Sequence, residues 1–340
     1  TYRYLANEKV WLNDTKTNLF RANFLSNLRT IEINSFSKRK LNFFPFISKT
    51  YNSVTGFNEN KLGAEIFLNT GTGKQINLTI NPDFGQAESD EVIVNFSAQE
   101  TFYSEKRAFF NENQSLFDLN HYDRYRIINT RRIGAGSNYL CSSTLNENDC
   151  INSKKNYTDI DYALRYTQKN NNLDFGIFVA KESDERYSNG KDFYAIRSKK
   201  KVDNRTIGYF LTHVENNFLN ESATVNVIDF ANVKSNKLTI YNDLISSERD
   251  GKTGFGYRSQ FNYKPTPLSR RSGSILYFDD NLILNDFGYL KKNDWFHIGI
   301  GSDISLIDFS KFKKIKELEL GIDFNYDSDI SGNSNPFRIG

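Results

Sequence analysis

The feature that most constrains this chain is a two-residue alternation of apolar and polar side chains that recurs from Tyr157 onward. In residues 159–167, Ile160, Tyr162 and Leu164 alternate with aspartate, alanine and arginine. Alternation of this period puts successive side chains on opposite faces of a β-strand. The same pattern recurs in residues 173–180, 254–263 and 318–326. The sequence therefore predicts an all-β protein of strands with one apolar and one polar face.

Further strands are expected near residues 192–200, 205–215, 222–230, 236–247, 272–280 and 295–306, and earlier at 38–51, 61–70 and 74–81. Clusters of Asn, Asp, Gly, Ser or Pro separate them, as turns require. Strands of this length, joined by short turns and longer loops, are typical of an antiparallel outer-membrane β-barrel. A β-sandwich alternates too, but the polar face here carries Asp, Arg, Glu, Gln and Gly, which suits a water-filled lumen.

The barrel hypothesis fixes which side chains point outward. The apolar set that we expect on the outer wall is Ile160, Tyr162, Leu164, Phe255, Tyr257, Leu320, Ile322 and Phe324. The polar set that we expect inside is Asp161, Arg165, Arg258, Gln260, Glu319 and Asp323. A slip of one residue in strand register would exchange the two sets.

Composition excludes other classes of protein. Aromatic residues make up 15% of the chain while the mean hydropathy is −0.60, which a membrane barrel explains because only every second residue of its strands must be apolar. No stretch approaches the ~18 apolar residues of a transmembrane helix. The net charge of +3 is scattered, so no basic face for nucleic acid is expected.

Between residues 83 and 120 the alternation breaks down, and charged residues stand among aromatic ones. Such a segment cannot face lipid, so we expect it in the lumen or at a rim. As a structural plug, it would pair its charges with lumen charges and pack its rings on the wall; as a ligand site, it would stack its rings on a sugar or peptide. The plug and lumen charges are Glu88, Asp90, Glu105, Lys106, Arg107, Arg131 and Arg132. The candidate stacking residues are Phe102, Tyr103, Phe109 and Phe110.

Residues 81–117 (NPDFGQAESDEVIVNFSAQETFYSEKRAFFNENQSLF) also carry a family resemblance, together with residues 41–51 (LNFFPFISKTY), 131–134 (RRIG) and 286–294 (DFGYLKKND). These stretches resemble a bacterial outer-membrane β-barrel family of unknown function, domain of unknown function fifty-nine sixteen. The resemblance implies a barrel, commonly joined behind a domain similar to family-9 carbohydrate-binding modules. It implies no catalytic residues.

The expected domain organisation is a lead-in from an upstream domain at residues 1–36 and a barrel at 37–340, with 83–140 as the internal plug. Because the chain has no Met and no signal peptide, we expect an internal piece of a longer secreted precursor. Three strands before Pro82 and about ten after Tyr157 are not expected to close a ring, so the remaining strands are predicted beyond Gly340.

Cys141 and Cys150 bracket a polar stretch rich in Ser and Asn. In an oxidising compartment this spacing suits a loop disulfide, which would contribute about 2–3 kcal/mol by the chain-entropy model. Two free thiols are the alternative.

Signatures of an enzyme are missing: there is no GxSxG or HExxH motif, and His121, His213 and His297 are far apart in sequence. We expect no cofactor and no metal. The predicted function is an outer-membrane barrel, embedded in lipid, that acts in transport or surface assembly of a glycan or peptide cargo, linked to carbohydrate handling. The rival is a soluble, secreted all-β protein that binds or degrades polysaccharide.

Overall fold

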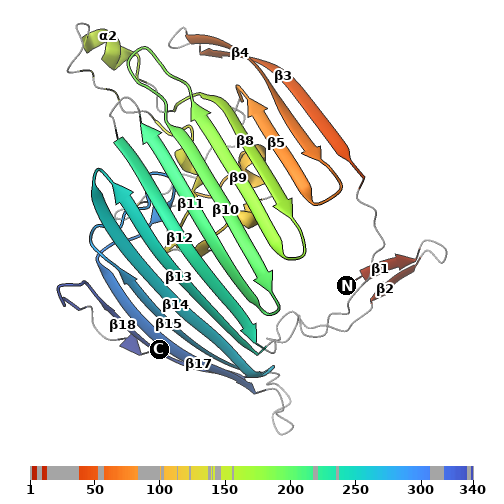
Figure 1. The fold of residues 1–340 in the computed structure, drawn as a ribbon, viewed down its shortest axis with the longest axis vertical. Coiled ribbons are helices and arrows are strands. Elements are labelled where there is room, and N and C mark those ends of the chain that lie inside the picture. Colours follow the sequence, from red (N-terminus) through yellow and green to blue (C-terminus); the bar gives the residue numbers. More distant parts are fainter. Residues whose placement is uncertain are drawn as a thin grey trace.

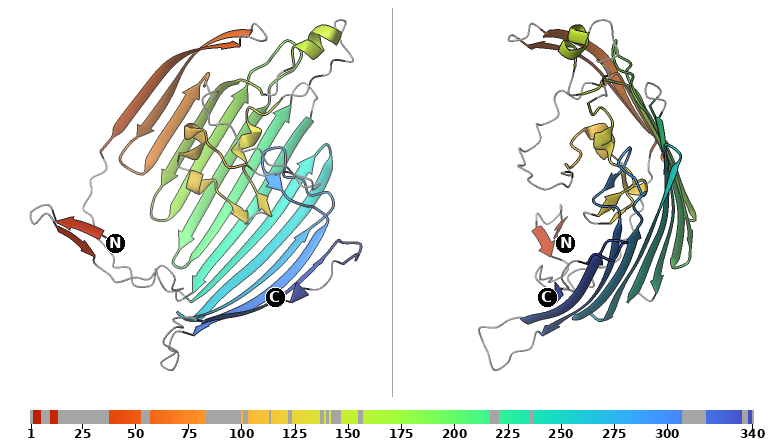
Figure 2. Two further views of the ribbon diagram at one scale, coloured as in Figure 1. Left: turned by 180° about the vertical axis from the view of Figure 1, so that it is seen from behind. Right: turned by 90° about the vertical axis from the view of Figure 1, so that its left-hand side faces the viewer.

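The fold is a single large curved sheet with irregular structure packed on its inner side (Figures 1 and 2). This computed structural model describes residues 2–5, 10–13, 38–52, 57–82, 100, 103–112, 114–121, 124–136, 139, 141, 147–154, 157–216, 221–234, 237–306, 318–334 and 338–339. Within these residues the sheet contains 14 strands in the order β19-β18-β17-β15-β14-β13-β12-β11-β10-β9-β8-β5-β4-β3, all antiparallel. Antiparallel neighbours that follow one another in sequence need only short connections.

The strands match the segments expected from the alternation. Three precede Pro82: β3 (Lys40–Asn52), β4 (Phe57–Asn69) and β5 (Lys74–Ile80). The later ones are β8 (Ile160–Lys169), β9 (Leu173–Glu182), β10 (Asp192–Val202), β11 (Arg205–Asn216), β12 (Glu221–Lys234), β13 (Leu238–Arg249), β14 (Lys252–Thr266), β15 (Ser269–Phe278), β17 (Trp295–Leu306), β18 (Leu318–Ser328) and β19 (Arg338–Ile339). A separate hairpin joins β1 (Tyr2–Leu5) to β2 (Val10–Asn13).

The two faces of the sheet differ as predicted. Residues directly opposite one another in an antiparallel pair share a face. Arg258 lies opposite Asp243 on the inner face and is buried, whereas Phe255, on the outer face, is 57% exposed. The same registers put Tyr162, Leu164, Tyr257, Leu320, Ile322 and Phe324 outside, and Arg165, Gln260, Glu319 and Asp323 inside.

Two residues depart from this prediction because β8 begins with a bulge. The pairing passes from Ile160↔Glu182 to Tyr162↔Lys181, so one residue of β8 has no opposite number. Ile160 therefore points inward and is only 3% exposed. Asp161, expected in the lumen, is exposed and accepts a hydrogen bond from the Ser183 hydroxyl.

The inner face is covered by what we call the inner segment, namely described residues 103–136 together with residues 279–294 (Figure 2, right). It contains the short helices α1 (Ala108–Asn111), η2 (Gln114–Leu116) and η3 (Thr130–Arg132) and a three-stranded sheet of β6 (Asn120–His121), β7 (Tyr125–Arg126) and β16 (Tyr289–Leu290). The helix α2 (Glu147–Asn152) lies further along the chain. None of the helices in the described ranges has the length and apolarity needed to cross a membrane.

The hydrophobic core lies between the sheet and the inner segment. Phe109 and Phe110 of α1 are fully buried, and so are Phe193 and Phe210 of the sheet. Phe287 of the inner segment packs on Phe193 with ring centroids 5.1 Å apart. Since a fully buried phenylalanine contributes about 1.5–3 kcal/mol, this core holds the inner segment against the sheet.

The strand connections differ between the two ends of the sheet. At one end, the turn end, they span residues 70–73, 170–172, 203–204, 235–237, 267–268 and 307–317. At the other, the loop end, they span residues 53–56, 81–159, 183–191, 217–220, 250–251 and 279–294. Both parts of the inner segment therefore leave the sheet at the loop end.

The sheet does not close into a ring: among the described residues, β3 forms one edge, and β18 with the short β19 forms the other. The prediction that these strands leave the barrel incomplete is confirmed. Where any further strands lie in the chain stays a prediction.

Candidate functional site

Stretches that are far apart in sequence meet in the inner segment. The Asn129 amide donates to the Phe287 carbonyl at 2.7 Å, and Arg132 Nε donates to the Gly288 carbonyl at 3.2 Å. A Cβ at Gly288 would lie 2.4 Å from the Arg126 carbonyl oxygen, so only glycine allows this approach. The RRIG and DFGYLKKND stretches thus form one structure against the sheet.

Glu105 and Arg107 form a buried ion pair within this structure. Arg107 Nη2 lies 2.7 Å from Glu105 Oε2, and both side chains are less than one-tenth exposed. Arg107 also donates to the carbonyls of Thr130 and Ile133, and the Thr130 hydroxyl donates to Glu105. Burial acts to raise the pKa of Glu105, but the hydrogen bonds and charge of Arg107 outweigh it and hold that pKa below its usual value.

This arrangement corrects one expectation. We expected Glu105 and Arg107 to pair with charges on inward strand positions, and they pair with each other instead. Two opposite charges separated by one residue in extended chain reach each other locally, and the carbonyls around η3 take up the remaining guanidinium donors. Lys106 is half-buried beside them, and its amide donates to Glu105 Oε1.

Of the candidate stacking residues, Phe109 and Phe110 expose no ring face to the lumen solvent. Both are fully buried; Phe109 packs on Phe67 and Phe110 on Phe178 of the sheet. Tyr103 is half-buried, and Phe102 lies outside the described residues. For these two phenylalanines, packing on the wall is the role that the structure supports.

The other predicted charges hold the segment together. Arg131 donates to the Ser104 carbonyl, and Arg132 Nη2 lies 2.6 Å from Glu100 Oε2. Glu88 and Asp90 lie outside the described residues. Cys141 forms a disulfide with Cys150 of α2.

Two sheet residues anchor the inner segment through its backbone. Arg165 of β8 donates to the carbonyls of Phe109 in α1 and of Glu112, which caps the C-terminal end of α1. Glu182 of β9 accepts from the Gly134 amide at 2.8 Å. Gly134 has φ +79°, which explains a glycine at this contact.

A second group of contacts centres on Tyr125 of β7. Its hydroxyl donates to Asp243, which also accepts from Arg258 Nε at 2.7 Å. Burial raises the pKa of Tyr125, and the charge of Asp243 acts in the same direction. Next to it, the His121 ring donates from Nε2 to Gln260 Oε1 at 3.1 Å, because an amide oxygen only accepts.

A third group joins Arg124 to His297 and Asp327. His297 Nδ1 lies 2.9 Å from Asp327 Oδ1, and Ser274 Oγ lies 3.4 Å from His297 Nε2. These are the residue types of a catalytic triad. However, Arg124 Nη2 donates to the same Nε2 at 3.0 Å, where the serine proton would have to go. A fixed cation beside this nitrogen opposes protonation, so the geometry favours a contact between segment and wall over a nucleophile.

Farther along the sheet, Arg197 and Asp229 form a buried bidentate pair on the inner face. A Cβ at Gly208 would lie 2.2 Å from Asp229 Oδ1, so the glycine opposite Asp229 makes room for the pair. The sequence analysis gave no role to this pair, His297 or Asp327, and it used residues 286–294 only for the family resemblance. The further signal was position on the polar face of a strand or in a long connection. In the described ranges, no group of His, Cys, Asp and Glu side chains is placed to hold a metal ion.

The environment of His121 predicts a dependence of stability on pH. Burial lowers its pKa from 6.5 to about 4, and the charges of Arg258, Arg124 and His297 act in the same direction. The unfolded chain therefore binds this proton at higher pH than the folded chain does. The stability contributed by neutral His121 is fully present above about pH 6.5 and is lost as the pH falls towards about 4.

We expect urea unfolding at pH 7.5 and pH 5 to show this loss in the natural protein. His121→Gln keeps a donor to Gln260 without the proton uptake, so its stability should change less between the two pH values. His213→Gln, on the outer face, is the matched control and should behave as the natural protein does. Equal pH dependence in all three proteins would contradict the prediction.

A family model described as "Domain of unknown function (DUF5916)" matches residues 37–336. No curated protein matches the chain. The fold is similar to Pseudomonas aeruginosa OccK11 (OpdR), with TM-score 0.39 and 10% identity over 88% of this chain and 75% of that one. It is also similar to a triple mutant of the Rhodopseudomonas blastica porin (TM-score 0.34, 8% identity, 85% and 84% covered) and to the outer membrane channel DcaP of Acinetobacter baumannii (TM-score 0.31, 8% identity, 90% and 97% covered). Likeness at this level says nothing about ligand or activity.

Proposed function

The chain belongs to the DUF5916 family, whose function is unknown, and from its own two faces we propose that it is an outer-membrane channel protein with an inner segment that obstructs the lumen. The observation that carries this proposal is the apolar outer face. Ile207, Ile228 and Leu244, on the neighbouring strands β11, β12 and β13, are 55%, 53% and 54% exposed. An apolar surface of this extent is unstable in water and stable in lipid.

Aromatic side chains support the same placement. Tyr162 and Tyr277 point outward near the loop end, and Phe261 points outward nearer the turn end. Outer-membrane barrels carry aromatic residues at both membrane interfaces, where an amphipathic ring meets lipid and water. The soluble rival would require this face to be covered.

The inner face supports transport of small solutes. Charged pairs and hydrogen-bonded residues line it, as in a water-filled lumen, and the inner segment narrows it. A role in surface assembly is the second form of this proposal. The link to carbohydrate handling rests on the family resemblance alone, and buried Phe109 and Phe110 do not serve as a sugar platform.

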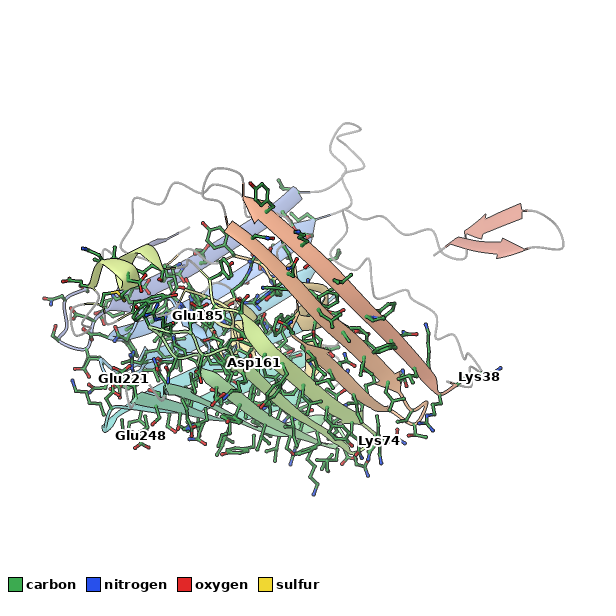
Figure 3. The ribbon with its side chains drawn as sticks, turned by 90° about the horizontal axis from the view of Figure 1, so that it is seen from above. Lys38, Lys74, Asp161, Glu185, Glu221 and Glu248 are labelled. Atoms are coloured by element: carbon green, nitrogen blue, oxygen red, sulfur yellow. A yellow bond between two sulfur atoms is a disulfide. The ribbon has the colours of Figure 1, made fainter. Side chains whose placement is uncertain are left out.

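The connections give an orientation. Outer-membrane barrels have short turns in the periplasm and longer loops outside the cell. The loop end should therefore face outward, and the inner segment should enter the lumen from that side. Charge differs between the ends as well: Asp161, Glu185, Glu221 and Glu248 mark the loop end, whereas Lys74 lies at the turn end (Figure 3).

Partition into the outer membrane with heat-modifiable gel mobility tests the placement, and cysteine labelling tests the orientation. Lys252 at the loop end and Lys237 at the turn end are both exposed. We expect Lys252→Cys to react with a membrane-impermeant maleimide on intact cells, and Lys237→Cys to react only after the outer membrane is permeabilised. The reverse pattern would invert the orientation, and recovery of the protein in soluble form would refute the membrane proposal.

A further inference from the structure

A cavity of about 220 Å³ lies between the inner segment and the wall. Its apolar lining consists of the buried rings of Phe178 from the wall and of Phe110 and Phe117 from the inner segment. Its polar lining includes Asn111, Asn129 and Thr130 of the inner segment. This volume equals the share of about seven waters in the liquid, which suits a compound with a single ring.

Arg165 lines the same cavity and is only 3% exposed. Its guanidinium donates to the carbonyls of Phe109 and Glu112 and lies over the rings of Phe109 and Phe178. Among the described residues it forms no ion pair with a carboxylate. The Glu112 carboxylate accepts from Asn77, and its charge acts on Arg165 without a direct ion pair. A buried cation whose direct contacts are carbonyls and ring faces attracts an anion, because a directly bound carboxylate would offset its desolvation further.

The other charges around the cavity are balanced. Glu105 is paired with Arg107, and Asp118 lies 3.4 Å from Arg126 in a partly exposed pair. Among the described residues that line the cavity, Arg165 is the charged group without a direct ion pair, and it lies next to aromatic rings.

We propose that this cavity binds a small aromatic carboxylate, with its ring among Phe110, Phe117 and Phe178 and its carboxylate on Arg165. A guanidinium offers a carboxylate two parallel donors, which fixes its orientation. The hydroxyl and amide groups of Thr130 and Asn129 complete a polar rim. This site goes beyond the channel proposal, since it can bind whether or not the lumen conducts.

The test uses benzoate as the probe, titrated calorimetrically into the full chain in detergent. Benzamide has the same shape without the charge, and acetate has the charge without the ring. We expect saturable benzoate binding, with benzamide and acetate each at least tenfold weaker. Arg165→Met should weaken benzoate binding at least tenfold. Arg270→Gln, at the turn end on an exposed pair with Asp303, is the matched control and should leave it unchanged.

Because Arg165 also donates hydrogen bonds to the backbone of α1 and its cap, the variant Arg165→Met can fail to fold. In that case the variant Ser104→Trp tests whether benzoate binds in this cavity. Ser104 is exposed at the cavity and holds Arg131 through its backbone carbonyl, so a tryptophan there should obstruct the cavity and abolish binding without unfolding the chain. Equal affinity for benzoate and benzamide, absence of benzoate binding, or unchanged binding in Ser104→Trp would each overturn the site. Conductance measured separately in planar bilayers tests the channel, so either proposal can fail alone.

Discussion

Arg107→Ala is expected to lower the stability of the inner segment by about 3–5 kcal/mol, because it leaves the buried carboxylate of Glu105 without its counter-charge. The variant also removes the donors to the Thr130 and Ile133 carbonyls, so α1 and η3 lose their common tie. If the inner segment obstructs the lumen, ion leakage through the reconstituted protein should rise. Planar-bilayer conductance and urea unfolding measure the two effects.

Arg186→Ala is the matched control. Arg186 pairs with Asp149 at 3.0 Å, but the Arg186 side chain is 72% exposed, so its loss should change stability by no more than about 1 kcal/mol. The double variant Glu105→Gln/Arg107→Met removes both buried charges and should be more stable than Arg107→Ala. If Arg107→Ala is destabilised but ion leakage through it stays at the level of the natural protein, the inner segment does not obstruct the lumen.

The second large effect is expected at the outer face. Ile228→Arg puts a charge halfway along β12, where Ile228 lies opposite Tyr209 and Leu244. In lipid, a charge near the bilayer midplane destabilises a barrel by about 2–4 kcal/mol, whereas near an interface the effect is about 0–1 kcal/mol. We expect a clear loss of heat-modifiable protein in the outer membrane.

Val202→Arg is the control on the same face. Val202 ends β10 beside the turn and is 52% exposed, about as much as Ile228. Equal assembly of the two variants would mean that depth does not matter. The apolar face would then not lie in lipid, and the soluble rival would be favoured.

The strands and their faces could be predicted because both follow from a period of two that is written into consecutive residues. Neighbours in a strand, such as Tyr257 and Arg258 or Glu319 and Leu320, point to opposite faces of the sheet regardless of the rest of the fold. The predicted outward orientation of Ile160 was wrong because the bulge depends on how β8 pairs with β9, and the local sequence pattern carries no information about that pairing.

The inner segment was harder to predict than the wall. The broken alternation and the charged residues exclude residues 83–120 from lipid, so the sequence predicts that this segment lies inside the barrel. The partners of each side chain, however, depend on long-range packing. The contact of Arg132 with Gly288 joins residues 156 positions apart, and nothing in residues 279–294 alone announces that they complete the same structure. Likewise Arg165 appears in the sequence only as one polar residue of an alternating strand.

The long connection between β5 and β8 has a consequence for the order of folding. Residues 81–159 separate these paired strands, whereas only residues 170–172 separate β8 from β9. By the loop-closure relation, bringing β5 to β8 costs about 3 kcal/mol more in chain entropy than forming the next hairpin. The successive hairpins from β8 onward should therefore form first, and strands β3 to β5 should pair with β8 last. By then residues 103–136 should already be packed on the sheet and provide the surface on which β3 to β5 dock.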